Sequence, residues 1–149
     1  MRIEHCQDVE EIRPLGRLWL EKMNAGQYGL DTDLDVAIED LKLWKNDFEG
    51  AILLAKVDDE PIGVFAMFVV ASYLGRQKIA IEKYWFVKDK QRMAGPRLYV
   101  EAVKWAKQHG CSHLITNASR LASDQHDSVC RFLERTGAMA FETSYIYRL

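Results

Sequence analysis

Two apolar runs separated by a short acidic turn constrain the fold of this chain most. Residues Ala51–Val57 and Pro61–Val70 are largely apolar, and Asp58-Asp59-Glu60 stands between them. Continuous apolar runs joined by so short a polar connection are typical of a buried β-hairpin. A third run, Lys78–Val87, has the same character. We therefore predict three strands at the centre of a covered sheet.

The segments on either side of these strands predict four helices and further strands. A helical apolar face follows the third strand, from near Pro96 to a stop at Gly110. Before the hairpin we expect a helix capped by Asp8, with Pro14 bending or delaying it, and a second helix from Asp33 to Trp44. The other expected elements are strands at Arg2–Cys6 and Ser112–Asn117, a helix through Val129–Leu133 ended by Thr136-Gly137, and a final β segment at Met139–Leu149.

This order of elements predicts one α/β domain covering residues 1–149. The 48% of hydrophobic residues can fill its core. The longest apolar run, Val64–Ala71, is too short to cross a bilayer, so we expect no membrane association. Three cysteines without a C-x-x-C pair offer neither a disulfide framework nor a metal site, which favours reduced thiols in the cytoplasm.

Charge is distributed unevenly along the chain. Before Gly75 there are 7 basic and 15 acidic residues, and after it 13 basic and 7 acidic. The segment from Lys88 to Arg97 carries four bases and one acid between the third strand and the following helix. Gly95 permits close approach of a ligand, and Pro96 suits a first helical turn whose amides are free. We predict a phosphate or pyrophosphate site there, with a solvated basic turn as the alternative.

Four segments resemble the GNAT superfamily of N-acetyltransferases: Val57–Gly63, Glu82–Val87, Val103–Gly110 and Phe132–Ala138. The resemblance implies a mixed α/β (α+β) fold, with a mostly antiparallel sheet of six to seven strands and helices on both faces. It also implies acetyl-CoA as cosubstrate, a primary amine of a small molecule or protein as acceptor, direct attack without a covalent intermediate, and a homodimer.

The family signature Q/R-x-x-G-x-G/A fits the basic loop in two registers. A start at Lys90 puts Met93 at the first glycine and Gly95 at the second, whereas a start at Arg92 puts Gly95 first and Arg97 second. The spacing from the signature to Ala106 on the following helix favours the start at Lys90. The resemblance then implies cofactor contacts from Phe86, Val87, Lys88, Gln91, Arg92, Met93, Ala94, Gly95, Pro96, Arg97, Asn117 and His126, the last in place of the family's asparagine.

Glu82 is the predicted general base. It is the one carboxylate in Lys78–Val87, a strand on which the family places a base, and a partly buried glutamate can have a pKa near neutrality. Regular alternation would put Glu82 on one face with Ala80, Tyr84 and Phe86. The alternative is a surface glutamate paired with Lys78 or Lys83.

The proton donor for the leaving thiolate is open. The family's frequent tyrosine aligns with Leu133, which has no proton to give. Tyr84, Tyr145, His126 and water are the candidates, and of these we take Tyr84 as the second catalytic residue.

Two other functions compete with acetyl transfer. Met93, His126 and Leu133 stand where the family has its usual glycine, asparagine and tyrosine. These replacements would suit a protein that binds acetyl-CoA without turnover. Binding of nucleic acid through Lys88, Lys90, Arg92 and Arg97 is disfavoured because the loop lacks aromatic residues for base stacking. The segment that would cover the acceptor is acidic. Its carboxylates suit a cationic amine, and the alternative is that they form a solvated helix face: Asp31, Asp33, Asp35, Glu39 and Asp40.

Overall fold

A computed structural model describes residues 1–72, 75–91, 93–122 and 124–148. The strands are β1 (Arg2–His5), β2 (Gly50–Val57), β3 (Glu60–Ala71), β4 (Lys78–Val87) and β5 (His113–Ile115). The α-helices are α1 (Arg13–Lys22), α2 (Leu34–Asp47), α3 (Ala94–Gln108) and α4 (His126–Arg135), and the 3₁₀ turns are η1 (Val9–Ile12) and η2 (Ala25–Tyr28).

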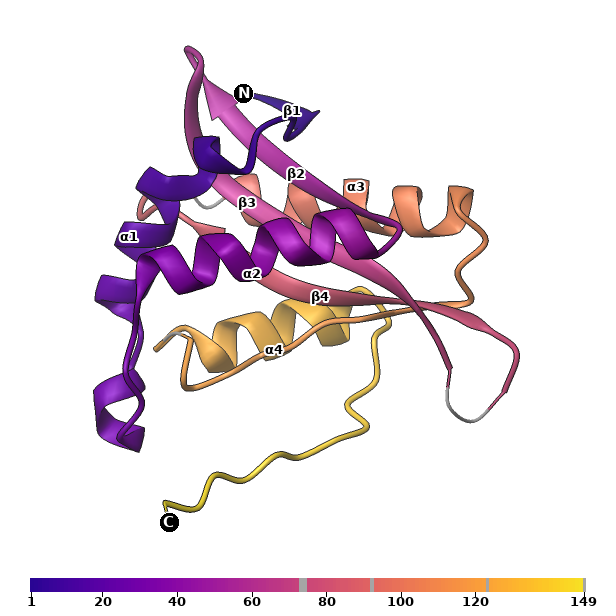
Figure 1. Cartoon of the computed structure of the whole chain (residues 1–149). Coiled ribbons are helices and arrows are strands. Elements are labelled where there is room, and N and C mark those ends of the chain that lie inside the picture. Colours follow the sequence, from indigo (N-terminus) through magenta and orange to yellow (C-terminus); the bar gives the residue numbers. More distant parts are fainter. Residues whose placement is uncertain (73–74, 92, 123, 149) are drawn as a thin grey trace.

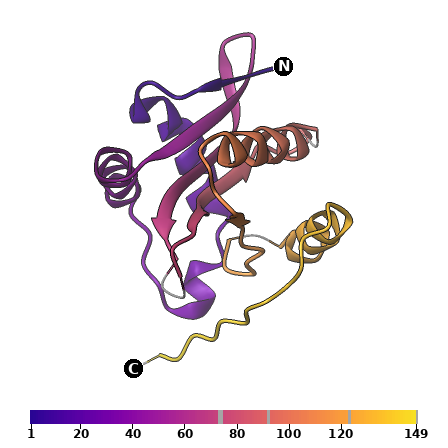
Figure 2. The same ribbon diagram turned by 90° about the vertical axis from the view of Figure 1, so that its right-hand side faces the viewer.

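The five strands form one mixed sheet in the order β1-β2-β3-β4-β5. Strands β1 to β4 pair antiparallel, and β5 joins β4 in parallel. Helices α1 and α2 lie over one face, and α3 and α4 lie over the other (Figures 1 and 2). The prediction of an α/β fold with helices on both faces is confirmed, as is the hairpin around Asp58-Asp59.

The predicted number of six to seven strands is wrong for the described residues, which contain five. The difference lies partly in the C-terminal segment, where a strand was expected at Met139–Leu149. Residues 138–148 have no helix or strand assignment, and the segment runs away from the sheet in Figure 1. Leu149 lies outside the described residues. Sequence alternation favoured a strand, but a strand also needs a partner, and the described chain provides none here.

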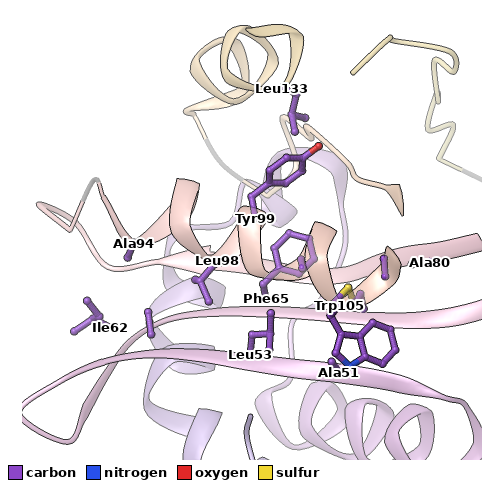
Figure 3. Packing of buried hydrophobic residues seen from close by; sticks show 14 residues of the cluster. Ala51, Leu53, Ile62, Phe65, Ala80, Ala94, Leu98, Tyr99, Trp105 and Leu133 are labelled. Atoms are coloured by element: carbon purple, nitrogen blue, oxygen red, sulfur yellow. The ribbon is translucent and has the colours of Figure 1, made fainter. Parts of the chain in front are cut away.

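Two apolar clusters fill the spaces on either side of the sheet. On the α3 side, Phe65 of β3 and Leu98 of α3 are fully buried, and Leu133 brings α4 against Tyr99 (Figure 3). On the other side, Leu15 of α1 and Leu41 of α2 pack on Leu54 and Phe68. Because both faces are covered, β2 and β3 are apolar along almost their whole length.

One register shift interrupts the pairing of β3 with β4. Ala66 lies opposite Tyr84, and Met67 lies opposite Glu82, so Lys83 is an extra residue on β4. This is a β-bulge, and it changes which side chains of β4 share a face.

Gly50, at the start of β2, is expected to tolerate no side chain. An added Cβ would lie 2.3 Å from Cδ1 of the buried Phe68 and 2.5 Å from the carbonyl oxygen of Met67. Gly50→Ala should lower the free energy of unfolding by about 3 kcal/mol in urea denaturation, because neither neighbour can move away freely. Gly26→Ala is the matched control, since an added Cβ there has no neighbour within 4 Å. Equal urea midpoints for the two variants would contradict this account.

Candidate active site

The site begins where β4 and β5 part. Their pairing covers only Ile79–Ile81 of β4 with His113–Ile115 of β5, whereas β4 continues to Val87. From Glu82 onward, the edge of β4 that faces away from β3 has no strand partner among the described residues. Such an edge presents backbone donors and acceptors that can bind an extended ligand.

Glu82 is the first residue beyond this pairing, and its side chain is partly buried. Its Oε2 accepts a hydrogen bond from the backbone amide of Asn117, at 2.9 Å, in the segment that follows β5. Burial raises the pKa of Glu82 to about 7, although the Asn117 hydrogen bond acts in the opposite direction. A carboxylate with a pKa near neutrality can take a proton from an ammonium group and give it up again.

The bulge places Glu82 and Tyr84 on opposite faces. Met67, opposite Glu82, packs on the α3 side, whereas Ala66, opposite Tyr84, packs on the side of α1 and α2. The expected common face of Ala80, Glu82, Tyr84 and Phe86 is therefore wrong, because the alternation changes phase at Lys83.

Tyr84 is held on the α2 side of the sheet. Its hydroxyl donates to Oδ2 of Asp40, at 3.1 Å, and its ring meets the ring of Trp19 edge-on at 4.9 Å. Burial, together with the Asp40 carboxylate, raises the pKa of Tyr84 well above its usual range. This environment makes Tyr84 a poor proton donor.

The stability of the protein is expected to depend on the ionisation of Glu82. Because its pKa is raised in the folded state, the stability gained from the protonated form is present below pH 4.5 and lost as the pH rises to about 7. Over this interval the loss is about 3 kcal/mol. Urea denaturation of Glu82→Gln and the wild type should show a difference that grows in favour of the variant from pH 4.5 to pH 8. A constant difference would contradict the raised pKa.

The start of α3 offers the predicted anion site. Met93 is the N-cap residue and makes no side-chain capping bond, Pro96 has no amide hydrogen, and the Gly95 amide has no partner within the described ranges. Lys90 adopts a left-handed backbone conformation with φ of 67°. A free amide at the positive end of a 15-residue helix attracts phosphate groups.

Two of the four basic side chains of this loop are engaged elsewhere. Lys88 forms an ion pair with Glu60, and Nη1 of Arg97 donates to the carbonyl oxygen of Met1 at 3.4 Å. Arg92 lies outside the described residues. Gln91 and Ala94 belong to the loop's own backbone hydrogen bonds. The predicted anion site would therefore depend on the helix start more than on Lys88 and Arg97.

Packing alone does not require a glycine at position 95. A Cβ added there would lie 3.7 Å from Trp85 and 3.8 Å from Val87, which is ordinary contact distance, and the backbone is not in the left-handed region. Close approach of a ligand therefore stays the predicted reason for this glycine.

The remaining predicted cofactor residues lie in different surroundings. Phe86 packs on the side of α1 and α2, Val87 packs on the α3 side, and Asn117 binds Glu82. Nε2 of His126, at the start of α4, lies 3.6 Å from Sγ of Cys130 and 4.0 Å from Asp127.

His126 also lines a polar pocket between the η2 turn and the segment before α4, together with Asn24, Gln27, Tyr28, Arg120, Asp124 and Asp127. Its Nδ1 is buried and has no hydrogen-bond partner among the described residues. The described contacts of His126 therefore join it to the η2 turn and to α4, and none of them is to the loop 88–97.

Sequence reasoning missed two residues that the structure brings to β4. Asp40 of α2 contacts both Lys83 and Tyr84, and the Lys83 ammonium lies 4.6 Å from the centre of the Trp44 ring. The sequence predicted Asp40 as one of five acidic residues suited to a cationic acceptor or to a solvated helix face, and not as a partner of β4. The sequence signal for the bulge is the spacing of Ala80 and Trp85, which pack in the same cluster although their positions differ by five. This signal cannot be recognised until the two faces of the strand are known.

Comparisons with known proteins agree with this architecture. The Acetyltransferase (GNAT) family matches residues 17–138, and the chain belongs to this family. No curated protein matches it closely enough to add a more specific relationship. In the described segments, no helix is both long and apolar enough to span a membrane.

Solved structures with low sequence identity share the fold. A putative acetyl transferase from Pyrococcus furiosus is 16% identical, with a TM-score of 0.74 and coverage of 99% of both chains. A ribosomal-protein-alanine N-acetyltransferase from Brucella melitensis biovar Abortus 2308 is 19% identical (TM-score 0.70, coverage 99% and 98%). An aminoglycoside acetyltransferase from an uncultured soil metagenomic sample, in complex with sisomicin, is 15% identical (TM-score 0.67, coverage 99% and 95%).

Proposed function

We propose that this protein transfers the acetyl group of acetyl-CoA to a primary amine of a small molecule or protein. The observation that carries the proposal is the position of Glu82. Its pKa is about 7, and it lies at the first residue of β4 beyond the pairing with β5, beside a backbone edge that has no strand partner in the described chain.

The cosubstrate would be held by backbone groups from two elements. The start of α3 would bind the pyrophosphate through the Gly95 amide and the positive end of the helix, and the open edge of β4 would hydrogen-bond the pantetheine arm. An amide of the same edge would stabilise the oxyanion that forms when the thioester carbonyl is attacked. Acetyl-CoA supplies the activated acetyl group.

Glu82 would act on the acceptor. Its carboxylate removes a proton from the ammonium, directly or through a water molecule, and the neutral amine attacks the carbonyl carbon. The carbon–sulfur bond then breaks, the CoA thiolate leaves, and the second proton of the attacking nitrogen passes through water to the thiolate. A thiol pKa near 8.5 makes the thiolate a good leaving group that water can protonate. This fits the buried position of Leu133, the engagement of Tyr84 with Asp40, and the 93% exposure of Tyr145.

The nature of the acceptor is proposed only as a primary amine. Two structural neighbours are named for a ribosomal-protein alanine and for an aminoglycoside, so the shared fold serves both protein and small-molecule acceptors.

A homodimer in the cytoplasm is a further part of the proposal. Four large side chains of the extended C-terminal segment are more than 70% exposed, and such residues favour contact with another chain: Met139, Phe141, Tyr145 and Tyr147. The three cysteines are free, as expected in a reducing compartment. Sedimentation of the full chain would test the dimer, and a monomer at all concentrations would contradict it.

The function is tested by calorimetric titration with acetyl-CoA, with CoA and ATP as comparisons, followed by thiol release in the presence of a polyamine, an aminoglycoside or a peptide with a free N-terminus. We expect saturable acetyl-CoA binding and release of one thiol per amide formed. Absence of binding would contradict the proposal. Binding without thiol release would instead support a protein that binds acetyl-CoA without turnover, which the absence of a proton donor at Leu133 also suits.

A further inference from the structure

Asp40 binds the side chains of both Lys83 and Tyr84 at the bulge in β4. Its Oδ2 lies 3.1 Å from the Tyr84 hydroxyl and 3.1 Å from Nζ of Lys83. The two residues are consecutive, yet both reach the same carboxylate on α2. This arrangement is possible because the side chains of a bulge do not alternate as those of a regular strand do.

The bulge follows from the way the strand packs. Ala80 and Trp85 both belong to the cluster on the α3 side, although their positions differ by five and a regular strand would place them on opposite faces. An extra residue between them is needed to bring both to one face. That extra residue, Lys83, is not part of the regular ladder with β3, so its side-chain contacts help to fix its orientation.

The anchored residues lie directly beside the proposed base. Glu82 precedes Lys83, points to the opposite face, and is tied to Asn117. On the α2 side, the bulge is tied by Asp40, and the ammonium of Lys83 also lies over the Trp44 ring. The orientation of the backbone from Glu82 to Tyr84 therefore depends on contacts from both sides of the sheet.

We propose that Asp40 is a positioning residue for acetyl transfer: by binding Lys83 and Tyr84 from α2, it fixes the bulge that orients Glu82 and the open edge of β4. The inference rests on the proposed function. Asp40 would touch neither acetyl-CoA nor the acceptor. Small displacements of a reacting group lower the rate steeply, so release of the bulge should affect the chemical step more than binding.

The test compares Asp40→Asn and Asp40→Ala with the wild type. Asparagine keeps an oxygen for the Tyr84 hydroxyl but loses the charge that binds Lys83, whereas alanine loses both contacts. We expect kcat to fall roughly tenfold for alanine and less for asparagine, with the Kd of acetyl-CoA within about twofold of wild type. Asp47→Asn is the matched control on the same helix, because Asp47 is exposed and has no contact with β4 in the described chain. It should keep full activity.

Two further measurements test the positioning role of Asp40 independently. If the alanine variant fails to fold, Lys83→Met and Tyr84→Phe remove the same contacts from the side of β4 and should each lower kcat. Amide hydrogen exchange between residues 82 and 87 should be faster in Asp40→Ala than in Asp47→Asn, whether or not the protein acetylates an amine.

An active wild type whose Asp40 variants keep full kcat would overturn the positioning role and leave the proposed function intact. A wild type without turnover would overturn the proposed function, and hydrogen exchange would then decide whether Asp40 fixes the bulge. Unchanged exchange rates would also overturn the inference that Asp40 fixes the bulge.

Discussion

Replacing Glu82 by glutamine is expected to lower kcat/KM for amine acetylation at pH 7 by roughly 10²- to 10⁴-fold, the range for loss of a general base. Glutamine is close in size and keeps an oxygen that can accept the Asn117 amide, so the strand should not change. The affinity for acetyl-CoA should also stay the same, because the pyrophosphate and the pantetheine arm are assigned to other groups. Steady-state rates of thiol release, with the Kd from calorimetry, measure both effects.

The pH dependence provides the control for this substitution. Glu82 accepts a proton only when it is ionised, so the wild-type kcat/KM should rise with pH and level off above an apparent pKa of about 7. The kcat/KM of Glu82→Gln should not show this rise with pH. Glu101→Gln is a matched substitution on α3, where Glu101 pairs with Lys104, and it should leave the profile unchanged. A glutamine variant with undiminished turnover across the pH series would remove Glu82 from the mechanism.

Replacing Met93 by aspartate is expected to weaken acetyl-CoA binding by about 10- to 100-fold, because a carboxylate at the start of α3 repels the phosphates and competes for the same helix end. Met93 is 69% exposed, so the change should not disturb the core. The fold should keep its stability, since an acidic side chain at a helix N-terminus is favourable.

Met93→Gln is the matched neutral control and should bind acetyl-CoA as the wild type does. The second control is the ligand S-acetyl-pantetheine, which lacks the pyrophosphate. Its affinity should be the same for aspartate and glutamine at position 93. Equal acetyl-CoA affinity of the two variants would show that the phosphates bind elsewhere, and equal losses for both ligands would indicate a general disturbance of the site.

The central strands and the helix after them could be predicted because local sequence determines them. The hairpin around Asp58-Asp59 has both turn residues in the left-handed region, at φ of 49° and 65°, as the tight connection requires. Glu82 could be predicted as a candidate base because it is the one carboxylate in Lys78–Val87 and because the family resemblance places a base on this strand. Its burial, its raised pKa and its bond to Asn117 depend on residues far away in the sequence.

The faces of β4 could not be predicted, because both sides of the sheet are covered by apolar residues. Alternation distinguishes the two sides of a strand only when one side is polar. The bulge at Lys83 and the pairing of Tyr84 with Asp40 both follow from packing between distant elements. The C-terminal segment shows the converse, since its alternating side chains have no partner strand in the described chain.

The transfer of an acetyl group to an amine is tested most directly with acetyl-CoA labelled with ¹³C at the carbonyl carbon. The protein is incubated with the labelled compound and an amine, and the carbonyl signal is followed by NMR. The account predicts that the thioester signal is replaced by an amide signal, and that Glu82→Gln slows the replacement. Label that stays in the thioester with every amine tested, or that appears only as acetate, would contradict it.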